Sequence, residues 1–516
     1  MSHPTDFPLR LSRASRRAVS VFASLIMLLA GMVAISRASD RAASPELPRS
    51  SPEAQGISSS AILAFVRAAD EQLDTMNSFL LVRHGHVVAE GYWAPYDAET
   101  RHALYSLTKS FTSTAVGLAV AEGRLRVDDL VLSYFPEDAP AEPGPGLKGM
   151  RVRDLLTMTA GHHSEAPQRP GDHWARNFLS QPVEHKPGTF FLYNTPASYM
   201  LSAIVQKATG AAMLEYLRPR LLEPLGIKDP VWNVSPQGVT NGGWGLKIRT
   251  REIARFGQLY LQKGEWRGRR LLPASWVEAA TSRQASNGSN PESDWDQGYG
   301  FQFWRCRNNA YRGDGAFGQF CVVMPEQDAV VVVTSGVRNM QAVLNLVWKH
   351  LLPAMKPAAL SADESARKRL EQTLAGLEVR TQQGSASSPM IDRVSGRKYT
   401  FPANDRKLEA ITLEVGAGSD ATLVVRQNGV EQRVACGRGA WKRGRLAYGD
   451  WPEQPVAASG AWTAPDTYTA KICFTEEPFI LTVSLRYSED HLLYDSEFNV
   501  FFGPTKHPQL IGSHVN

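Results

Sequence analysis

The sequence lacks the motifs that mark several common classes of enzyme. It has four cysteines in 516 residues, with no Cys-x-x-Cys pair, and none of its twelve histidines forms a His-Glu-x-x-His motif. The close pairs His84/His86 and His162/His163 are better explained as exposed turn and loop residues than as zinc ligands. Gly-x-Ser-x-Gly is also absent, which argues against an α/β-hydrolase fold. We therefore expect no metal site and no cofactor.

Basic charge is scarce outside the first part of the chain. The formal net charge is +5, but residues 1–44 alone carry six arginines, no lysine and two acidic residues. The leader therefore holds +4 of this charge, and the remaining residues hold +1. A nearly neutral chain does not provide the basic surface on which nucleic-acid binding depends. With 43% hydrophobic and 21% charged residues, the chain can instead bury an ordinary core.

The leader has the order of features found in export signals. Arg10–Arg17 supplies positive charge, and Ala18–Ile35 is an uncharged, largely apolar run. Small residues at Ser36 and Ala38 then suit a cleavage site. An uncleaved membrane anchor is the alternative, because such a run just reaches the length that spans a bilayer. Either case predicts a periplasmic or extracellular protein that meets the membrane only through this segment.

The cysteines fall into two pairs in strand-rich regions, Cys306/Cys321 and Cys436/Cys473. Since export permits disulfide formation, two local bridges are the expected arrangement. Sequence alone does not fix their connectivity.

Strand-like segments lie on both sides of a helical middle region. A hairpin is predicted over residues 78–93, turning at Gly85, and helices are predicted over 106–123 and 196–208. Further strands are expected over 300–306, 318–324 and 329–334, followed by a helix over 340–352. This order predicts one sheet built from distant halves of the chain, with helices packed on it.

A change in composition predicts a second domain. Residues 381–389 are polar and small, so we expect a linker that does not pack. Period-2 segments beyond it predict a small all-β domain. The expected organisation is a leader over 1–44, a main domain over 45–356, a helix and linker over 357–392, and a β domain over 393–516.

Ser106 and Lys109 form a Ser-x-x-Lys motif, which also occurs at Ser365–Lys368 and Ser395–Lys398. Only Ser106 opens a helix whose next residues are apolar and small, so only this copy is expected to be buried. At this spacing the hydroxyl and the amine share one helix face. A serine needs a base, and a lysine can act as one only where burial or neighbouring groups lower its pKa. The non-catalytic alternative is a helix-capping serine beside a solvated lysine.

Five segments together resemble the serine β-lactamase and penicillin-binding superfamily. The similarity is greatest to its class C-like branch, which includes carboxylesterases, D-aminopeptidases and 6-aminohexanoate-dimer hydrolases. The segments are Tyr105–Phe111, Leu155–Gly161, Pro187–Tyr193, Gly242–Leu246 and Gly315–Gln319. The resemblance implies an α+β fold, with a β-lactamase-like antiparallel sheet flanked by helices and a separate helical region. The appended β domain also resembles a domain found in some of these hydrolases.

The resemblance also implies roles for individual residues. Ser106 would be the acylated nucleophile, Lys109 its base, and Tyr193 a proton relay to the leaving group. The third motif would lie on a strand at residues 316–318. The backbone N–H groups of Ser106 and Gln319 would form the oxyanion hole.

Two departures from the superfamily bear on the substrate. The usual Tyr-x-Asn is replaced by Tyr193-Asn194-Thr195, and Ala316 stands where the third motif usually carries a cation. Thr195, Ala316 and Gly318 are therefore candidate substrate-binding residues of a site suited to neutral esters or amides rather than penicillins. Trp244 either lines this site or anchors its loop.

The sequence thus predicts a serine hydrolase that cleaves a small ester, amide or peptide-like substrate. A penicillin-recognising or ligand-binding module with little turnover is the alternative. A protein that binds the bacterial wall through its β domain, with a vestigial site, is a third possibility.

Overall fold

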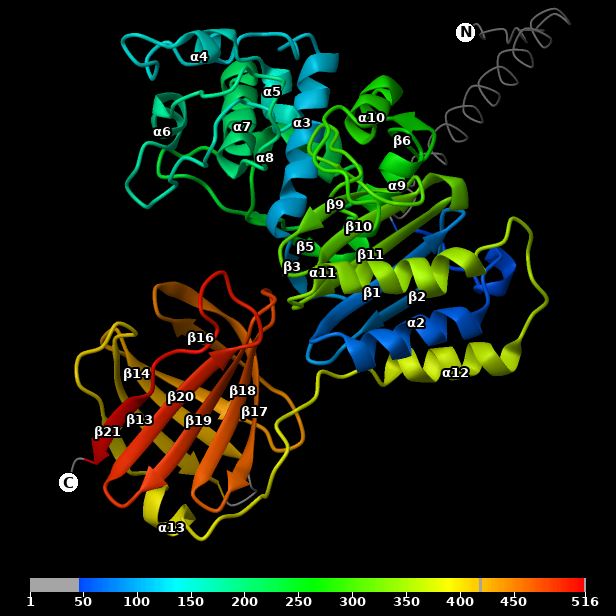
Figure 1. Cartoon of the computed structure of the whole chain (residues 1–516). Coiled ribbons are helices and arrows are strands. Elements are labelled where there is room, and N and C mark those ends of the chain that lie inside the picture. The colour runs from blue at the N-terminus through cyan, green and yellow to red at the C-terminus, as the bar shows by residue number, and fades with distance from the viewer. Residues whose placement is uncertain (1–45, 417–419, 515–516) are drawn as a thin grey trace, which may run out of the picture. The chain divides into compact units, whose positions relative to one another are not determined.

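The computed structural model describes residues 46–416 and 420–514 (Figure 1). The predicted export leader, residues 1–44, lies outside the described residues. Within the described ranges, no helix is both long and apolar enough to cross a membrane. The described residues from Leu47 onward pack as one unit.

A six-stranded antiparallel sheet joins the two halves of the main domain, as the sequence predicts. The central pair, β1 and β11, places Leu80 opposite Val332, 252 positions away in the sequence. The strand order is β2 (His86–Tyr92), β1 (Met76–Arg83), β11 (Ala329–Ser335), β10 (Gln319–Met324), β9 (Tyr311–Gly315) and β8 (Trp304–Arg305). The strand predicted over 300–306 is reduced to β8, and β9 was not predicted because Arg312 and Asp314 interrupt its apolar pattern.

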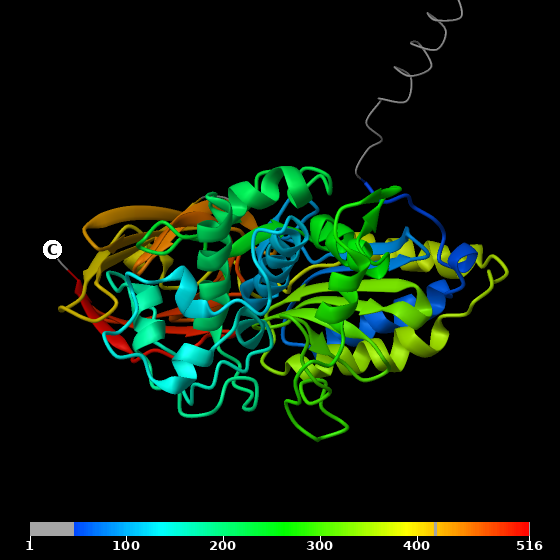
Figure 2. The same cartoon turned by 90° about the horizontal axis from the view of Figure 1, so that it is seen from above.

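Both faces of this sheet are covered by helices, which explains why its central strands are buried over their whole length. Alternate residues of β1 enter different cores, Leu80 on one face and Phe79 on the other. The Phe79 face carries α2 (Ser59–Gln72), α11 (Met340–Leu346) and α12 (Glu364–Ala375). The Leu80 face carries α3 (Thr108–Ala121), α9 (Thr250–Leu261) and α10 (Ala274–Thr281). Figure 2 shows these layers from above.

A separate helical region surrounds α3, the helix that follows Ser106 (Figure 1). Its longest member is α7 (Thr195–Thr209), which begins with an Asn194 side-chain cap and ends at Gly210 in the left-handed conformation, φ 74°. The predicted helix ending at Gly210 is therefore confirmed. The remaining helices are α4 (Pro145–Gly149), α5 (Val152–Leu156), α6 (Trp174–Ser180) and α8 (Met213–Leu217). A small sheet connects this region to the nucleophile, with strands β3 (Arg101–Ala103), β5 (Leu246–Arg249) and β4 (Val231–Trp232). A further hairpin pairs β6 (Glu265–Trp266) with β7 (Arg269–Arg270).

The C-terminal part of the chain is an all-β domain, again as predicted. Its ten strands form one nearly closed antiparallel sheet, and a bridge between Gly437 and Ser459 brings the two ends of the sheet together. The strands are, in spatial order, β15 (Val430–Cys436), β14 (Ala421–Gln427), β13 (Leu408–Val415), β12 (Lys398–Thr400), β21 (Leu510–His514), β20 (His491–Phe498), β19 (Ile480–Ser488), β18 (Thr467–Phe474), β17 (Trp451–Ala464) and β16 (Lys442–Tyr448). The short helix α13 (Ile391–Val394) precedes them.

The segment predicted to be an unpacked linker lies instead along β17. Ser385 and Trp462 exchange two backbone hydrogen bonds, at 2.7 and 3.1 Å. The Gln382 N–H donates to Ser459 Oγ at 2.8 Å, and Thr381 is buried. The prediction that residues 381–389 do not pack is wrong, because backbone hydrogen bonds to a strand need no large side chains. The exact domain boundaries stay a prediction.

The two predicted disulfide bridges are absent, and all four cysteines are buried free thiols. Cys321 belongs to the core on the Leu80 face of the sheet, whereas Cys306 belongs to the core on the other face. Cys436 lies in the core of the β domain, while Cys473 is close enough to Tyr96 of the main domain to raise the pKa of that phenol. Each pair is therefore separated by a sheet, and the prediction is wrong.

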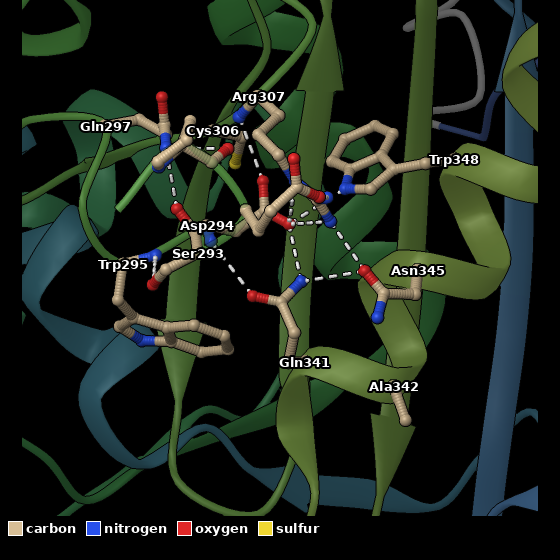
Figure 3. A network of polar contacts seen from close by, with 12 residues as sticks. Ser293, Asp294, Trp295, Gln297, Cys306, Arg307, Gln341, Ala342, Asn345 and Trp348 are labelled. Atoms are coloured by element: carbon tan, nitrogen blue, oxygen red, sulfur yellow. Dashed lines mark hydrogen bonds and ion pairs between the residues drawn. The ribbon is translucent and has the colours of Figure 1, made fainter. Parts of the chain in front are cut away.

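A buried carboxylate fixes the segment that leads into β8 and β9 (Figure 3). Asp294 is fully buried, and its Oδ2 accepts from Arg307 at 2.9 Å, Gln341 at 2.6 Å and Trp348 at 2.9 Å. Burial alone would raise the pKa of Asp294, but these donors hold it below its usual range. The carboxylate thereby ties the segment between Asp294 and Arg307 to α11, since breaking a buried, hydrogen-bonded pair is costly.

Candidate active site

Ser106 lies in a 3-10 turn, Tyr105–Leu107, immediately before α3. Leu104 and Leu107 on either side are fully buried, which holds this turn against the core. Tyr105 has a positive φ of 47°, an uncommon conformation for a non-glycine residue. A strained residue beside a nucleophile is typical of functional sites.

Lys109 lies one helical turn beyond Ser106 and is almost completely buried, with 1% of its surface exposed. Its Nζ is 2.9 Å from Ser106 Oγ, 2.8 Å from the Gly243 carbonyl oxygen and 3.4 Å from Thr195 Oγ1. Burial lowers the pKa of Lys109 from 10.5 to about 7, although the negative charges of Glu165 and Asp314 act in the opposite direction. A solvated lysine, the non-catalytic alternative, is excluded by this burial.

The three contacts accommodate either protonation state of the amine, and the lowered pKa favours the neutral form above about pH 7. A neutral lysine has two N–H donors and one lone pair, and the Gly243 carbonyl oxygen can only accept a hydrogen bond. With its donors directed to Gly243 and Thr195, the lone pair is left to accept the proton of the Ser106 hydroxyl. The pair is therefore arranged for serine activation near neutral pH.

Tyr193 completes the group around the serine. Its phenol is close enough to Ser106 for the two side chains to interact, and Lys109 Nζ lies 4.9 Å from the centroid of its ring. The ring stacks on Trp304 at 5.1 Å and meets Tyr299 edge-on at 6.1 Å. Burial raises the pKa of Tyr193 above its usual value, so the phenol is neutral. A neutral phenol in this position can pass a proton between the serine and a leaving group.

The two residues after Tyr193 face different partners. Asn194 is buried and caps α7, accepting the Ala197 N–H at 3.1 Å, so it is an N-cap residue. Thr195 is half-buried beside Lys109, and its backbone N–H donates to Glu165 Oε1 at 2.6 Å. Of the two residues, Thr195 is therefore the one next to the reacting pair.

The segment from Asn241 to Gly245 contacts the Lys109 amine through the Gly243 carbonyl oxygen. Asn241 Oδ1 accepts the Gly243 N–H at 2.9 Å, which fixes the carbonyl group that binds Lys109. Trp244, the next residue, is 37% exposed and lines a cleft. The Trp244 side chain therefore lines this cleft and is not a buried side chain that anchors its loop.

The third predicted segment is a turn and not a strand. Residues 316–318 connect β9 to β10, and the strand that approaches the nucleophile is β9. A Cβ added at Gly313 would lie 3.1 Å from the Leu107 side chain, and one at Gly315 would lie 2.1 Å from the Leu104 carbonyl oxygen. Any larger residue at Gly315 would therefore push β9 away from the turn that carries Ser106.

Gln319 begins β10 opposite Gly315. Its side-chain amide donates to the Ala316 carbonyl at 3.2 Å and to the Ser335 carbonyl at 2.7 Å, which holds the turn in place. Ala316 is half-buried, and Gly318 has a φ of 91°. The oxyanion-hole role of the Gln319 N–H stays a prediction.

Sequence reasoning missed several residues around the site. Asp314 is buried and paired with Arg312 at 2.7 Å, and burial raises the pKa of this carboxyl despite the neighbouring guanidinium. The only signal in the sequence was the alternation of charged residues and glycines in Arg312-Gly313-Asp314-Gly315, a pattern that is typical of a turn. Trp304 and Tyr299 support Tyr193, and Glu165 supports Thr195, but their sequence positions gave no indication of these contacts.

Several histidines are structural. His84 and His86 lie at the β1–β2 turn, as predicted, but His162 is buried edge-on against Phe178, so the prediction that it is exposed is wrong. His173 caps α6, accepting the Arg176 N–H at 3.3 Å. Within residues 46–416 and 420–514, no group of three or more metal-binding side chains comes together.

Comparisons with known proteins identify relatives of this chain. A family model described as Beta-lactamase matches residues 67–344. The 6-aminohexanoate-dimer hydrolase of Paenarthrobacter ureafaciens is 28% identical over 289 residues, which cover 50% of this chain and 72% of the relative. A Salmonella heidelberg (strain SL476) protein, provisionally named D-alanyl-D-alanine carboxypeptidase, is 27% identical over 229 residues. That match covers 38% of this chain and about half of the relative, 53%.

A solved structure of a Bacillus anthracis protein, provisionally named 6-aminohexanoate-dimer hydrolase, superposes with a TM-score of 0.49 at 20% identity. The superposition covers 59% of this chain and 86% of that protein.

The fold and the serine–lysine site define this protein as a hydrolase with a β-lactamase-like fold. The family model covers more than half of the chain, and the chain belongs to the Beta-lactamase family.

Proposed function

We propose that this protein hydrolyses a neutral ester or amide through an acyl-enzyme on Ser106. The observation that carries the proposal is the buried Lys109 amine, 2.9 Å from Ser106 Oγ. Lys109 takes the hydroxyl proton as the serine attacks the carbonyl carbon, and Tyr193 delivers a proton to the leaving group. Water then attacks the acyl-enzyme, releasing the acid and restoring the serine. The proton transfers of both steps pass between Ser106, Lys109 and Tyr193.

The charges around the site support a substrate without a carboxylate. Ala316 supplies no cation, while the carboxyl groups of Glu165 and Asp314 are close enough to act on Lys109. An anionic group on the substrate would therefore meet the carboxylate of Glu165, while the charge of Asp314 is already compensated by Arg312. The name of the Paenarthrobacter relative specifies a 6-aminohexanoate dimer, which is an amide with a free carboxylate, so this name supports amide hydrolysis and not the absence of a carboxylate. The export of the protein remains part of the proposal.

Covalent labelling tests the nucleophile. The purified chain is treated with a fluorophosphonate probe, and the labelled peptide is located by mass spectrometry. We expect the label on Ser106, unchanged in Ser365→Ala and Ser395→Ala, because those two serines lie outside the site. A folded protein that carries no label would contradict the proposal and favour the binding module.

The pH dependence of ester hydrolysis tests the base. Lys109 must be neutral to accept the serine proton, and its pKa is about 7. We therefore expect kcat/KM to rise with pH through about 7 and to level off above it, because this profile reports groups of the free enzyme. A profile that stays flat from pH 5 to 9 would show that Lys109 is not the base.

A further inference from the structure

A cleft of about 530 Å³ opens between the main domain and the β domain, next to the nucleophile. Six aromatic residues line it, and both domains contribute to them. The main domain supplies Tyr105 and Trp244, and the β domain supplies Trp451, Phe479, Phe501 and Phe502. We call these six residues the aromatic cleft. Phe502 is 69% exposed, an unusual position for a large apolar side chain unless something binds to it.

The aromatic cleft includes the direct sequence neighbours of two residues of the catalytic group. Tyr105 immediately precedes Ser106, and its ring lies 5.5 Å from Phe502 and 6.4 Å from Phe479. Its hydroxyl donates to Glu477 of the β domain at 2.8 Å. Trp244 follows Gly243, whose carbonyl oxygen binds Lys109. The cleft therefore begins one residue away from the nucleophile and from the carbonyl group that contacts Lys109.

The charged residues of this cleft neutralise one another. Six charged side chains line it, and they form three ion pairs: Arg101–Glu476 at 2.9 Å, Lys247–Glu477 at 2.6 Å and Arg445–Glu453 at 2.9 Å. A charged group entering the cleft would lose hydration without finding an unpaired partner. Aromatic walls with compensated charges suit a neutral, apolar group.

The position of Tyr193 indicates which part of the substrate enters. Tyr193 must reach the leaving group to protonate it, and it packs with Trp304 and Tyr299. Tyr105 belongs to a different cluster, with Phe317, Phe479 and Phe502. Neither Tyr193 nor its partners Trp304 and Tyr299 line the cleft, so we assign the leaving group to the Tyr193 cluster and the cleft to the acyl group.

We infer that the aromatic cleft binds the acyl group of the substrate, and that this group is neutral and either aromatic or a long apolar chain. The inference rests on the proposed function. It assigns to the β domain a direct part in substrate selection, because four of the six cleft residues belong to it.

Two p-nitrophenyl esters with the same leaving group test the inference. The ratio of kcat/KM for the 4-phenylbutanoate to that for the acetate is measured in the full chain, in Phe502→Ala and in Ile511→Ala. Ile511 is the matched control, since it is apolar, 55% exposed and on β21 outside the cleft. We expect the ratio to exceed one in the full chain, to fall about tenfold in Phe502→Ala, and to stay unchanged in Ile511→Ala. An unchanged ratio in Phe502→Ala would overturn the inference.

A binding measurement separates this inference from the proposed function. In Ser106→Ala protein, which has no nucleophile, binding of 4-phenylbutanamide is followed by tryptophan fluorescence, because Trp244 and Trp451 line the cleft. We expect binding that weakens about tenfold when Phe502→Ala is added. If the amide binds but Ser106 is not labelled in the unmodified chain, the cleft is a binding site and the proposed hydrolase function is wrong. If Ser106 is labelled but the amide does not bind, the hydrolase function stands and the inference about the cleft is wrong.

Discussion

Replacing Ser106 by alanine is expected to lower kcat for ester hydrolysis by about 10⁶-fold, the scale at which serine hydrolases lose activity without their nucleophile. The hydroxyl is half-buried between Lys109 and Tyr193, and its removal leaves both partners in place. The alanine side chain fits the same turn, so the fold should be retained. The measurement is the steady-state hydrolysis of a neutral p-nitrophenyl ester, alongside thermal unfolding of the variant.

Ser365→Ala is the matched control for this experiment. Ser365 begins another Ser-x-x-Lys motif, but it lies exposed on α12, beside a charged helix surface. Its replacement should leave kcat within about twofold, as exposed substitutions away from a site usually do. If Ser106→Ala retained more than a hundredth of the activity, another residue would have to be the nucleophile.

The local part of this site could be predicted from the sequence because the relevant spacing is short. Ser106 and Lys109 are one helical turn apart, so a helix brings them together whatever surrounds them. The same holds for α7, whose start and end are set by Asn194 and Gly210 within the segment itself. The apolar runs within β1 and β11 also predicted the main sheet, since both strands are buried over their whole length and need helices on both faces.

Contacts between distant segments could not be predicted in this way. Tyr105 and Glu477 are 372 positions apart, and nothing near either residue indicates that one hydrogen-bonds to the other. The cysteines show the same limit. Their spacing permitted two local bridges, but the sequence did not reveal that Cys306 and Cys321 enter cores on opposite faces of one sheet.

The buried pair Arg312–Asp314 shows why β9 was missed. Charged residues usually mark exposed positions, so two of them in a short segment look like a turn. Here each charge is satisfied by the other at 2.7 Å, and the strand is buried along its whole length. The strand nearest the nucleophile was therefore the one whose sequence least resembled a strand.

Replacing Lys109 by methionine is expected to lower kcat/KM by at least about 10⁴-fold while raising the stability of the protein. The loss follows because Lys109 is the described base at hydrogen-bond distance from Ser106 Oγ, and the phenol of nearby Tyr193 is neutral. Methionine has a similar length and fills the same buried space. Since Ser106 and Lys109 act as one unit, the double variant with Ser106→Ala should be no less active than Ser106→Ala alone.

The stability change has a defined pH dependence. The pKa of Lys109 is about 7 in the folded protein and near 10.5 when exposed, so between these values the unfolded chain binds more protons than the folded one. Stability of the unmodified protein therefore rises with pH across this window, and the cost of the buried ammonium is greatest below pH 7. The gain in melting temperature from Lys109→Met should be largest at pH 6 and smallest at pH 10. Lys368→Met, at an exposed lysine of α12, should change neither activity nor melting temperature. A methionine variant that was less stable at pH 6 would mean that Lys109 is an ammonium held by favourable partners, and it would contradict its role as the base.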